Sequence, residues 1–127
     1  MQCIIDTHCW LWSQAQPASL TSKQREIIED TENTIIFSVV SAWEIAIKYT
    51  VNKLKLPATP EKYIPQRLQT SYMEIMPIQL GHVLYVSNLP PYHNDPFDRL
   101  LIAQAQIERL PILTQDKKFT AYDVEII

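Results

Sequence analysis

The sequence predicts an α/β fold, namely a three-layer α/β/α sandwich around a central, mostly parallel sheet of four to five strands. Short, nearly all-apolar runs alternate with longer segments of helical periodicity, a pattern typical of a parallel sheet covered on both faces. The 127 residues suffice for one sizeable core, and a hydrophobic fraction of 46% is ordinary for a globular chain. We therefore expect one domain, residues 1–127, with ligands bound outside the carboxyl ends of the strands.

The first half of the chain reads as two strands, each followed by a helix. Thr21 and Gln24 have the spacing of a capping box, which predicts where the first helix begins. The run TIIFSVV is apolar and β-branched, as in a buried strand, and Ser41 begins the helix after it. The predicted elements are strand 1–5, helix 20–31, strand 34–40 and helix 41–53.

The second half contains the clearest helix, which begins at Pro96 and has apolar residues at core spacing. Gly81 is the sole glycine, which excludes glycine-rich phosphate loops of the Walker or dinucleotide kind. The predicted elements are helix 61–70, strand 73–78, helix 79–88, helix 96–109, strand 111–114 and a candidate fifth strand at 124–127.

The composition indicates a cytoplasmic protein. No apolar stretch approaches the roughly 20 residues that span a bilayer, and the beginning of the chain lacks the basic region of a signal peptide. Cys3 and Cys9 have no metal-binding spacing and are expected to be reduced packing residues. The net charge of −3 is unlike the basic footprint of nucleic-acid binders, but one bound divalent ion would change it to −1 and two to +1.

Four carboxylates fall where the predicted strands end and the next helices begin. Asp6 follows the first strand, Asp116 follows the strand at 111–114, and Glu44 lies in the first turn after the second strand. Asp98 lies in the first turn of the helix that leads into the last of these strands. Carboxylates gathered at one edge repel one another unless a cation lies among them, and their hard oxygens suit Mg²⁺ or Mn²⁺.

Each acid also has a purely structural interpretation. Ser41 and Glu44 fit the S-x-x-E capping box, and Asp95 before Pro96 suits a helix N-cap. Asp98 is then an ordinary first-turn acid, and the acids at the strand ends are turn residues.

Several stretches resemble the PIN-domain nucleases, in the right order along the chain. The opening CIIDTHCWLW, the LLIAQA after Asp98 and the PILTQDKKF stretch carry the general likeness. More narrowly, SAWEIAIKYTVNKLKL, HNDPFDRLLIAQA and LPILTQD resemble the VapC-type toxins of toxin–antitoxin pairs. The likeness runs from Cys3 to Val124, and DPFDRLLIAQA is its most specific part.

The resemblance implies a Mg²⁺- or Mn²⁺-dependent endoribonuclease that cuts RNA with one or two ions and is held inactive by a cognate antitoxin. It implies that Asp6 and Asp98 are the principal metal ligands, and that Glu44 and Asp116 complete the pocket directly or through water. Thr114 would be a supporting hydroxyl near Asp116. All four acids of the family pattern are present.

Other residues have less specific signals. We expect Trp10, Leu11 and Trp12 to be core and dimer-face residues, in keeping with a homodimer, rather than base-stacking platforms. His8 and His93 are near the acids in sequence, and either could contact a phosphate or could be a surface histidine. Four basic residues are placed to hold a phosphate backbone: Arg99, Lys48, Lys117 and Lys118.

Four alternative functions differ in the residues that they require. A haloacid dehalogenase-type phosphotransferase needs an aspartate two residues after Asp6, where this chain has His8. A receiver-like domain needs paired acids before its acceptor aspartate, and residues 2–5 contain none. A PIN-type nuclease acting on RNA or structured DNA outside a toxin–antitoxin pair stays open. So does a non-catalytic binding module, although no acid is missing.

Overall fold

The computed structural model describes residues 1–127 and has a four-stranded, entirely parallel sheet with strand order β3-β2-β1-β4. The strands are β1 (Gln2–Ile5), β2 (Thr34–Ser38), β3 (Glu74–Met76) and β4 (Ile112–Leu113). The α-helices are α1 (Thr7–Ala15), α2 (Ser22–Glu29), α3 (Val39–Thr50), α4 (Pro60–Ser71), α5 (Leu80–Tyr85) and α6 (Pro96–Glu108). Three 3₁₀ turns complete the chain: η1 (Pro17–Ser19), η2 (Val86–Asn88) and η3 (Lys117–Ala121).

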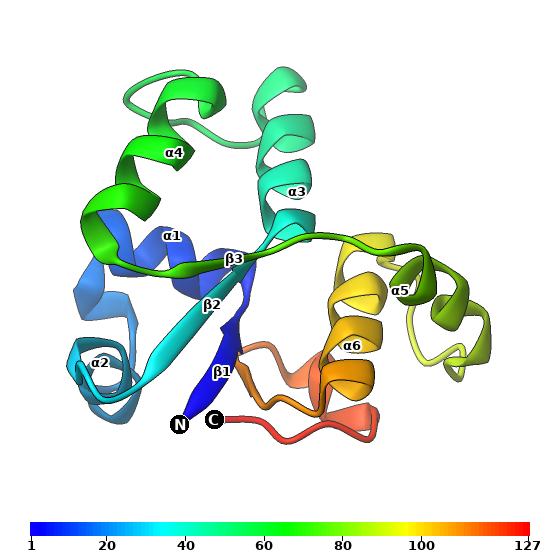
Figure 1. Cartoon of the computed structure of the whole chain (residues 1–127). Coiled ribbons are helices and arrows are strands. Elements are labelled where there is room, and N and C mark those ends of the chain that lie inside the picture. Colours follow the sequence, from blue (N-terminus) through cyan, green and yellow to red (C-terminus); the bar gives the residue numbers. More distant parts are fainter.

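Two separate cores, one on each face of the sheet, confirm the three-layer prediction. Cys3 and Ile5 of β1 pack with α1, α2 and α4, whereas Ile4 faces the opposite way and packs with α6. This alternation follows from the period of two along a strand. Figure 1 shows the sheet with α1, α2 and α4 on one side and α5 and α6 on the other. Residues 2–5 are therefore apolar at nearly every position because both faces of β1 are covered.

The sequence prediction missed α1. The segment after β1 is a helix whose N-cap is Asp6, with the side chain accepting a hydrogen bond from the backbone N–H of Cys9. Its run of four apolar residues, CWLW, has no helical alternation and so gave no periodic signal. As a result, Asp6 lies both at the carboxyl end of β1 and at a helix N-terminus.

The predicted boundary between β2 and the next helix was also wrong. Val39 and Val40 are helical, and Ser38 is the N-cap, its hydroxyl accepting a hydrogen bond from the N–H of Val40. Ser41 is therefore inside the first turn, and the predicted Ser41–Glu44 capping box does not exist.

The remaining elements agree with the sequence prediction to within a few residues. The capping box at Thr21 and Gln24 is present, and Asp95 is the N-cap of α6, with Pro96 at its first position. The predicted helix 79–88 is divided into α5 and η2. The candidate fifth strand is reduced to one parallel bridge between Ile112 and Ile126. No helix combines the length and apolar character needed to cross a bilayer.

Candidate active site

The structure brings all four predicted carboxylates to one pocket of about 210 Å³, at the carboxyl edge of the sheet. They come from four elements: the end of β1, the second turn of α3, the first turn of α6 and the segment after β4. Glu44 was expected in the first turn, but α3 begins at Val39, so Glu44 is its sixth residue. The full lining consists of Asp6, Thr7, His8, Val40, Glu44, Lys48, Asp95, Phe97, Asp98, Leu101, Asp116 and Lys118. The predicted place of Asp98 at this edge, which the strand order alone did not settle, is thus observed.

Asp6 is the most constrained of the four. It is buried, with Oδ1 accepting a hydrogen bond from the Cys9 N–H at 2.7 Å and Oδ2 accepting one from the Thr114 hydroxyl. Burial raises the pKa of Asp6 above its ordinary value, and these two hydrogen bonds oppose that rise without cancelling it. The buried carboxylate is therefore held in one orientation but would be stabilised further by a cation.

Glu44 is buried as well, with 4% of its surface exposed, and a donor contacts each of its oxygens. The Thr7 hydroxyl donates to Oε1 at 2.7 Å and also lies 2.9 Å from Ser41 Oγ. Lys48, one helical turn further along α3, forms an ion pair with Oε2. Burial lowers the pKa of Lys48, but the hydrogen bond and charge of Glu44 outweigh it and raise that pKa. Ser41, predicted as a cap, thus contacts Thr7 instead.

Asp98 lies in the first turn of α6, where its backbone N–H donates to the Asp95 side chain at 2.9 Å. Its Oδ2 lies 3.1 Å from Nε2 of His93. Burial raises the pKa of Asp98 to about 6, helped first by the charge of Asp95 and then by those of Glu44 and Asp116, while the His93 contact lowers it. This carboxyl group is the one at which repulsion among the acids is most evident.

Asp116 is exposed at the mouth of the pocket and accepts a hydrogen bond from the N–H of Lys118 at 2.9 Å. Its own N–H donates to the Thr114 hydroxyl at 3.0 Å. Thr114 therefore does lie next to Asp116, as predicted, but its hydroxyl proton goes to Asp6.

The donor chemistry of the pocket fits a hard divalent cation. Carboxylate oxygens are the preferred ligands of Mg²⁺ and Mn²⁺, and a cation among them would relieve the repulsion felt by Asp98. No three acids, histidines or cysteines are spaced as a ready-made metal site. Glu44, in particular, is already paired with Lys48. The side chains most available to a cation are thus Asp6, Asp98 and Asp116.

The basic residues predicted to hold phosphate are in different situations. Lys48 and Lys118 line the pocket, and Lys117 does not. The Arg99 guanidinium donates to the carbonyls of Val86, Leu89 and Pro90 and to the Tyr122 hydroxyl, so its donors serve the protein itself.

The three histidines are also distinct. His8 is exposed and lines the pocket. His93 lies between two partners: its Nδ1 is 2.7 Å from the Tyr122 hydroxyl, and its Nε2 contacts Asp98. This histidine therefore helps to hold the Asp98 side chain in place. His82 is buried, lies 3.0 Å from Glu108 and accepts a hydrogen bond from the Gln79 N–H.

The tryptophans are packing residues. Trp10 is completely buried against Phe37, so it has no surface to offer a dimer, contrary to that part of the prediction. Leu11 and Trp12 are partly buried against the same core. Trp43 is 45% exposed and packs edge-on against Phe97 at 4.7 Å, near the mouth of the acidic pocket.

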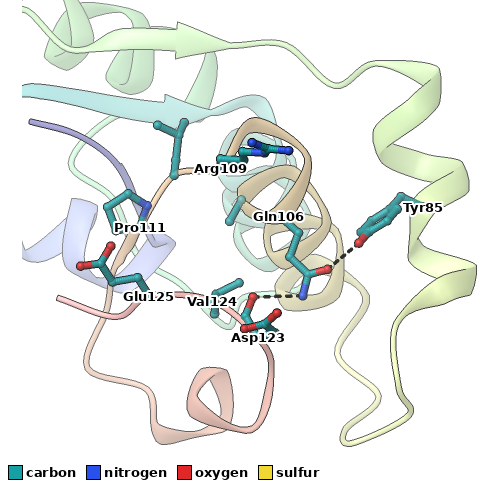
Figure 2. A pocket seen from close by; sticks show the side chains of 9 residues that line it. Tyr85, Gln106, Arg109, Pro111, Asp123, Val124 and Glu125 are labelled. Atoms are coloured by element: carbon teal, nitrogen blue, oxygen red, sulfur yellow. Dashed lines mark hydrogen bonds between the residues drawn. The ribbon is translucent and has the colours of Figure 1, made fainter.

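A second hollow, of about 310 Å³, lies beside the C-terminal end of α6 and contains none of the predicted site residues. Figure 2 shows Arg109, Asp123 and Glu125 around it, with Gln106 bonded to Tyr85 and to the backbone of Asp123. The charged residues lie on an open surface and the Gln106 amide is already hydrogen-bonded, so this hollow has no arrangement of groups typical of an active site.

Sequence comparison identifies a PIN domain over residues 3–125. Ribonuclease VapC16 of Mycobacterium tuberculosis is 32% identical over 68 residues, which span 54% of this chain and 48% of that protein. The match therefore covers about half the length of this relative.

Solved structures with the same fold cover the whole chain at low identity. VapBC2 from Rickettsia felis, bound to a DNA fragment from its promoter, has a TM-score of 0.73 and 19% identity, and 98% of that chain is covered. DNA-bound VapBC from Salmonella typhimurium has a TM-score of 0.69 and 13% identity, with 97% covered. FitAcB from Neisseria gonorrhoeae has a TM-score of 0.64 and 19% identity, with 96% covered. With residues 3–125 matched and the fold shared throughout, this chain belongs to the PIN domain family.

Proposed function

We propose that this protein is a Mg²⁺- or Mn²⁺-dependent endoribonuclease that hydrolyses RNA phosphodiester bonds, and that it is the toxin of a toxin–antitoxin pair. The observation that carries the proposal is the single pocket lined by Asp6, Glu44, Asp98 and Asp116. Membership of the PIN domain family and the similarity to a protein named ribonuclease VapC16 support it.

Asp6 and Asp98 are the proposed principal ligands of one or two ions, and Glu44 and Asp116 complete the pocket directly or through water. When bound, such an ion activates a water molecule near neutral pH and stabilises the charge that develops on the phosphate. The residues around the acids hold the proposed metal ligands in position. Thr114 and the Cys9 N–H hold Asp6, and His93 with the Asp95-capped start of α6 holds Asp98.

The RNA phosphate would lie at the mouth of the pocket. Three helices, α1, α3 and α6, begin there, and the partial positive charge of a helix N-terminus favours an anion. Lys118, which lines the pocket, is the basic residue best placed to contact the phosphate. Lys117 is a more peripheral candidate. Arg99 is not a phosphate contact in this proposal, because its donors are occupied by backbone carbonyls.

A cognate antitoxin is the proposed protein partner. Three of the structural neighbours are described as VapBC or FitAcB assemblies, and the pocket carries an excess of acids over lysines. An arginine or lysine of the antitoxin between Asp6 and Asp98 would displace the ion and exclude phosphate.

We also propose a cytoplasmic location and a homodimer, for which the exposed stripe Trp43, Ile47 and Val51 along α3 is a candidate surface.

Two alternatives have specific discriminators. A PIN nuclease outside a toxin–antitoxin pair would cleave RNA or structured DNA but would be harmless when overproduced without a partner. A non-catalytic binding module would bind nucleic acid without cutting it, and the presence of all four acids argues against this.

The test is cleavage of a labelled mixed-sequence RNA, and of a hairpin DNA, in EDTA and in Mg²⁺ or Mn²⁺. RNA should be cut only when the metal is present. Asp98→Asn should lower the cleavage rate by more than roughly 10–100-fold, which is the loss expected for a residue that only supports a metal ligand. Asp123→Asn is the matched control, because it removes an exposed carboxylate outside the pocket. Cleavage in EDTA, or full activity of Asp98→Asn with unchanged unfolding, would contradict the proposal.

A further inference from the structure

Lys48 lies four residues after Glu44 on α3, and its ammonium group is paired with Oε2 of Glu44. A glutamate one turn before a lysine is the favourable orientation for such a pair. The glutamate side chain is only 5% exposed and that of Lys48 is 32% exposed, so the pair faces the pocket rather than open solvent. Both residues line it.

The pairing leaves Glu44 in a different state from the other acids. The Thr7 hydroxyl occupies Oε1 and Lys48 occupies Oε2. Asp6 also has a donor on each oxygen, but both donors are neutral and do not repel a cation. An ion that approached Glu44 would meet the full positive charge of Lys48 at contact distance.

The charges that line the pocket make this ammonium group distinctive. Five carboxylates line it, namely those of Asp6, Glu44, Asp95, Asp98 and Asp116. Two lysines also line it, and Lys48 alone is paired with an acid, whereas Lys118 is exposed at the rim. Lys48 thus supplies the positive charge within the pocket when no metal is bound.

We propose that Lys48 is a built-in counter-ion that keeps Glu44 from ligating metal, so that the pocket binds a single divalent ion on the side of Asp6 and Asp98. The inference rests on the proposed metal-dependent function and decides between one ion and two. Lys48 acts through Glu44 and is therefore a positioning residue. Its removal frees a buried carboxylate whose only remaining donor is Thr7, which creates a place for a second ion.

The experiment is calorimetric titration of the metal-free full chain with Mn²⁺, which counts ions without using activity. The wild type should bind one ion. Lys48→Gln should bind two, or bind the first roughly tenfold more tightly, because a unit charge a few ångströms from the ion has been removed. Lys48→Arg keeps the charge and should resemble the wild type. Lys53→Gln, three residues beyond the end of α3, is the control for loss of one lysine.

Thermal unfolding gives an independent measurement. Lys48→Gln should lower the melting temperature of the metal-free protein and enlarge the increase caused by Mn²⁺, because the counter-ion is then supplied only from solution. If this variant is unfolded without metal, Mn²⁺ should refold it, as followed by circular dichroism. The double variant Lys48→Gln/Glu44→Gln has no freed carboxylate and should again bind one ion.

The outcomes separate this inference from the function on which it rests. Two ions in the wild type would overturn it. So would unchanged stoichiometry and affinity in Lys48→Gln, or failure of Mn²⁺ to refold that variant at concentrations that saturate the wild type. Absence of any Mn²⁺ binding by the wild type would instead overturn the proposed metal-dependent nuclease itself.

Discussion

The hydroxyl of Thr114 donates a hydrogen bond to Oδ2 of Asp6, although the two residues are 108 positions apart in the sequence. The same hydroxyl accepts a hydrogen bond from the N–H of Asp116. Because β1 and β4 are adjacent parallel strands, with Ile5 opposite Leu113, the register of the sheet brings these groups together. One side chain therefore fixes two of the four acids relative to each other.

Thr114→Val should lower the free energy of unfolding by about 1–3 kcal/mol, because buried Asp6 loses a donor and the Asp116 N–H loses its acceptor. The pKa of Asp6 should rise further, since the Thr114 hydrogen bond lowers it, and metal affinity at neutral pH should weaken. Urea unfolding and Mn²⁺ titration measure both effects. Thr114→Ser should restore both, and a valine variant as stable as the wild type would refute the role of the hydroxyl.

Divalent metal should raise the melting temperature relative to EDTA, because the ion binds only the folded arrangement of carboxylates. Asp6→Asn should abolish this increase, since it removes a proposed principal ligand. Differential scanning fluorimetry in EDTA and at about 1 mM Mg²⁺ or Mn²⁺ makes the comparison. Identical melting with and without either metal, under conditions where RNA is cut, would exclude the predicted coupling.

The stability of the metal-free protein should fall as the pH rises through the titration of Asp98. Its pKa is about 6 in the folded chain against an ordinary value of 3.8, so the folded state favours the protonated acid. That stabilisation is complete below about pH 4 and is lost as the pH passes 6. The change should be on the order of 1 kcal/mol after allowance for solvent screening.

Asp98→Asn should remove this part of the pH dependence and leave the part due to Asp6, whose pKa is raised as well. Urea unfolding of the metal-free protein at pH 4, 5, 6 and 7 (roughly one-unit steps across the titration) measures it. The same slope in the variant and the wild type would show that Asp98 does not titrate as described.

Arg99→Lys should destabilise the protein without weakening RNA binding. The planar guanidinium contacts the carbonyls of Val86, Leu89 and Pro90, and a lysine cannot reproduce that fork of donors. A loss of about 1–3 kcal/mol is expected from urea unfolding. Lys118→Ala should show the opposite pattern, with unchanged stability and weaker RNA binding in fluorescence anisotropy. A selective loss of RNA affinity in Arg99→Lys would restore Arg99 as a phosphate contact.

The two cysteines should resist alkylation in the folded protein. Both are free and buried, and burial raises the pKa of Cys3 to about 11 and that of Cys9 further still. Because the thiolate is the reactive form, iodoacetamide at pH 8 should label neither until urea unfolds the chain. Mass spectrometry of the native protein checks this, and rapid labelling of either residue would contradict the burial.

The sequence predicted most of the sheet because a parallel sheet buried on both faces requires apolar residues at nearly every position of a strand. The helix from Pro96 was equally clear, since its cap, its proline and its apolar spacing agree. The sequence-based prediction failed at α1, where the bulky apolar run CWLW hides the helical period of 3.6 residues. Asp6, the N-cap of this helix, also comes directly after β1, so no loop separates the strand from the helix. The prediction also failed at Val39 and Val40, whose β-branched side chains extended an apparent strand past the true cap, Ser38.

The four acids could be predicted because each lies shortly after a strand or in the first two turns of a helix, so that topology alone brings most of them to one edge. The contacts that hold them could not. Thr7 and Ser41 meet only when α1 packs against α3, and Arg99 contacts backbone carbonyls in and just after η2, which side-chain patterns do not reveal. The ion pair between Glu44 and Lys48 was not predicted, although the sequence contains its signal, because the two residues are four positions apart on a predicted helix.

The order of the strands has a consequence for the time at which activity arises during synthesis. β4 pairs with β1 and is followed by Thr114 and Asp116, so β1 keeps an open edge until β4 has left the ribosome. Asp6 and Glu44 are present early, yet the pocket stays incomplete until residue 116 has emerged and docked. A nascent chain that has not yet exposed residue 116 therefore lacks a complete set of acids, however early Asp6 and Glu44 emerge.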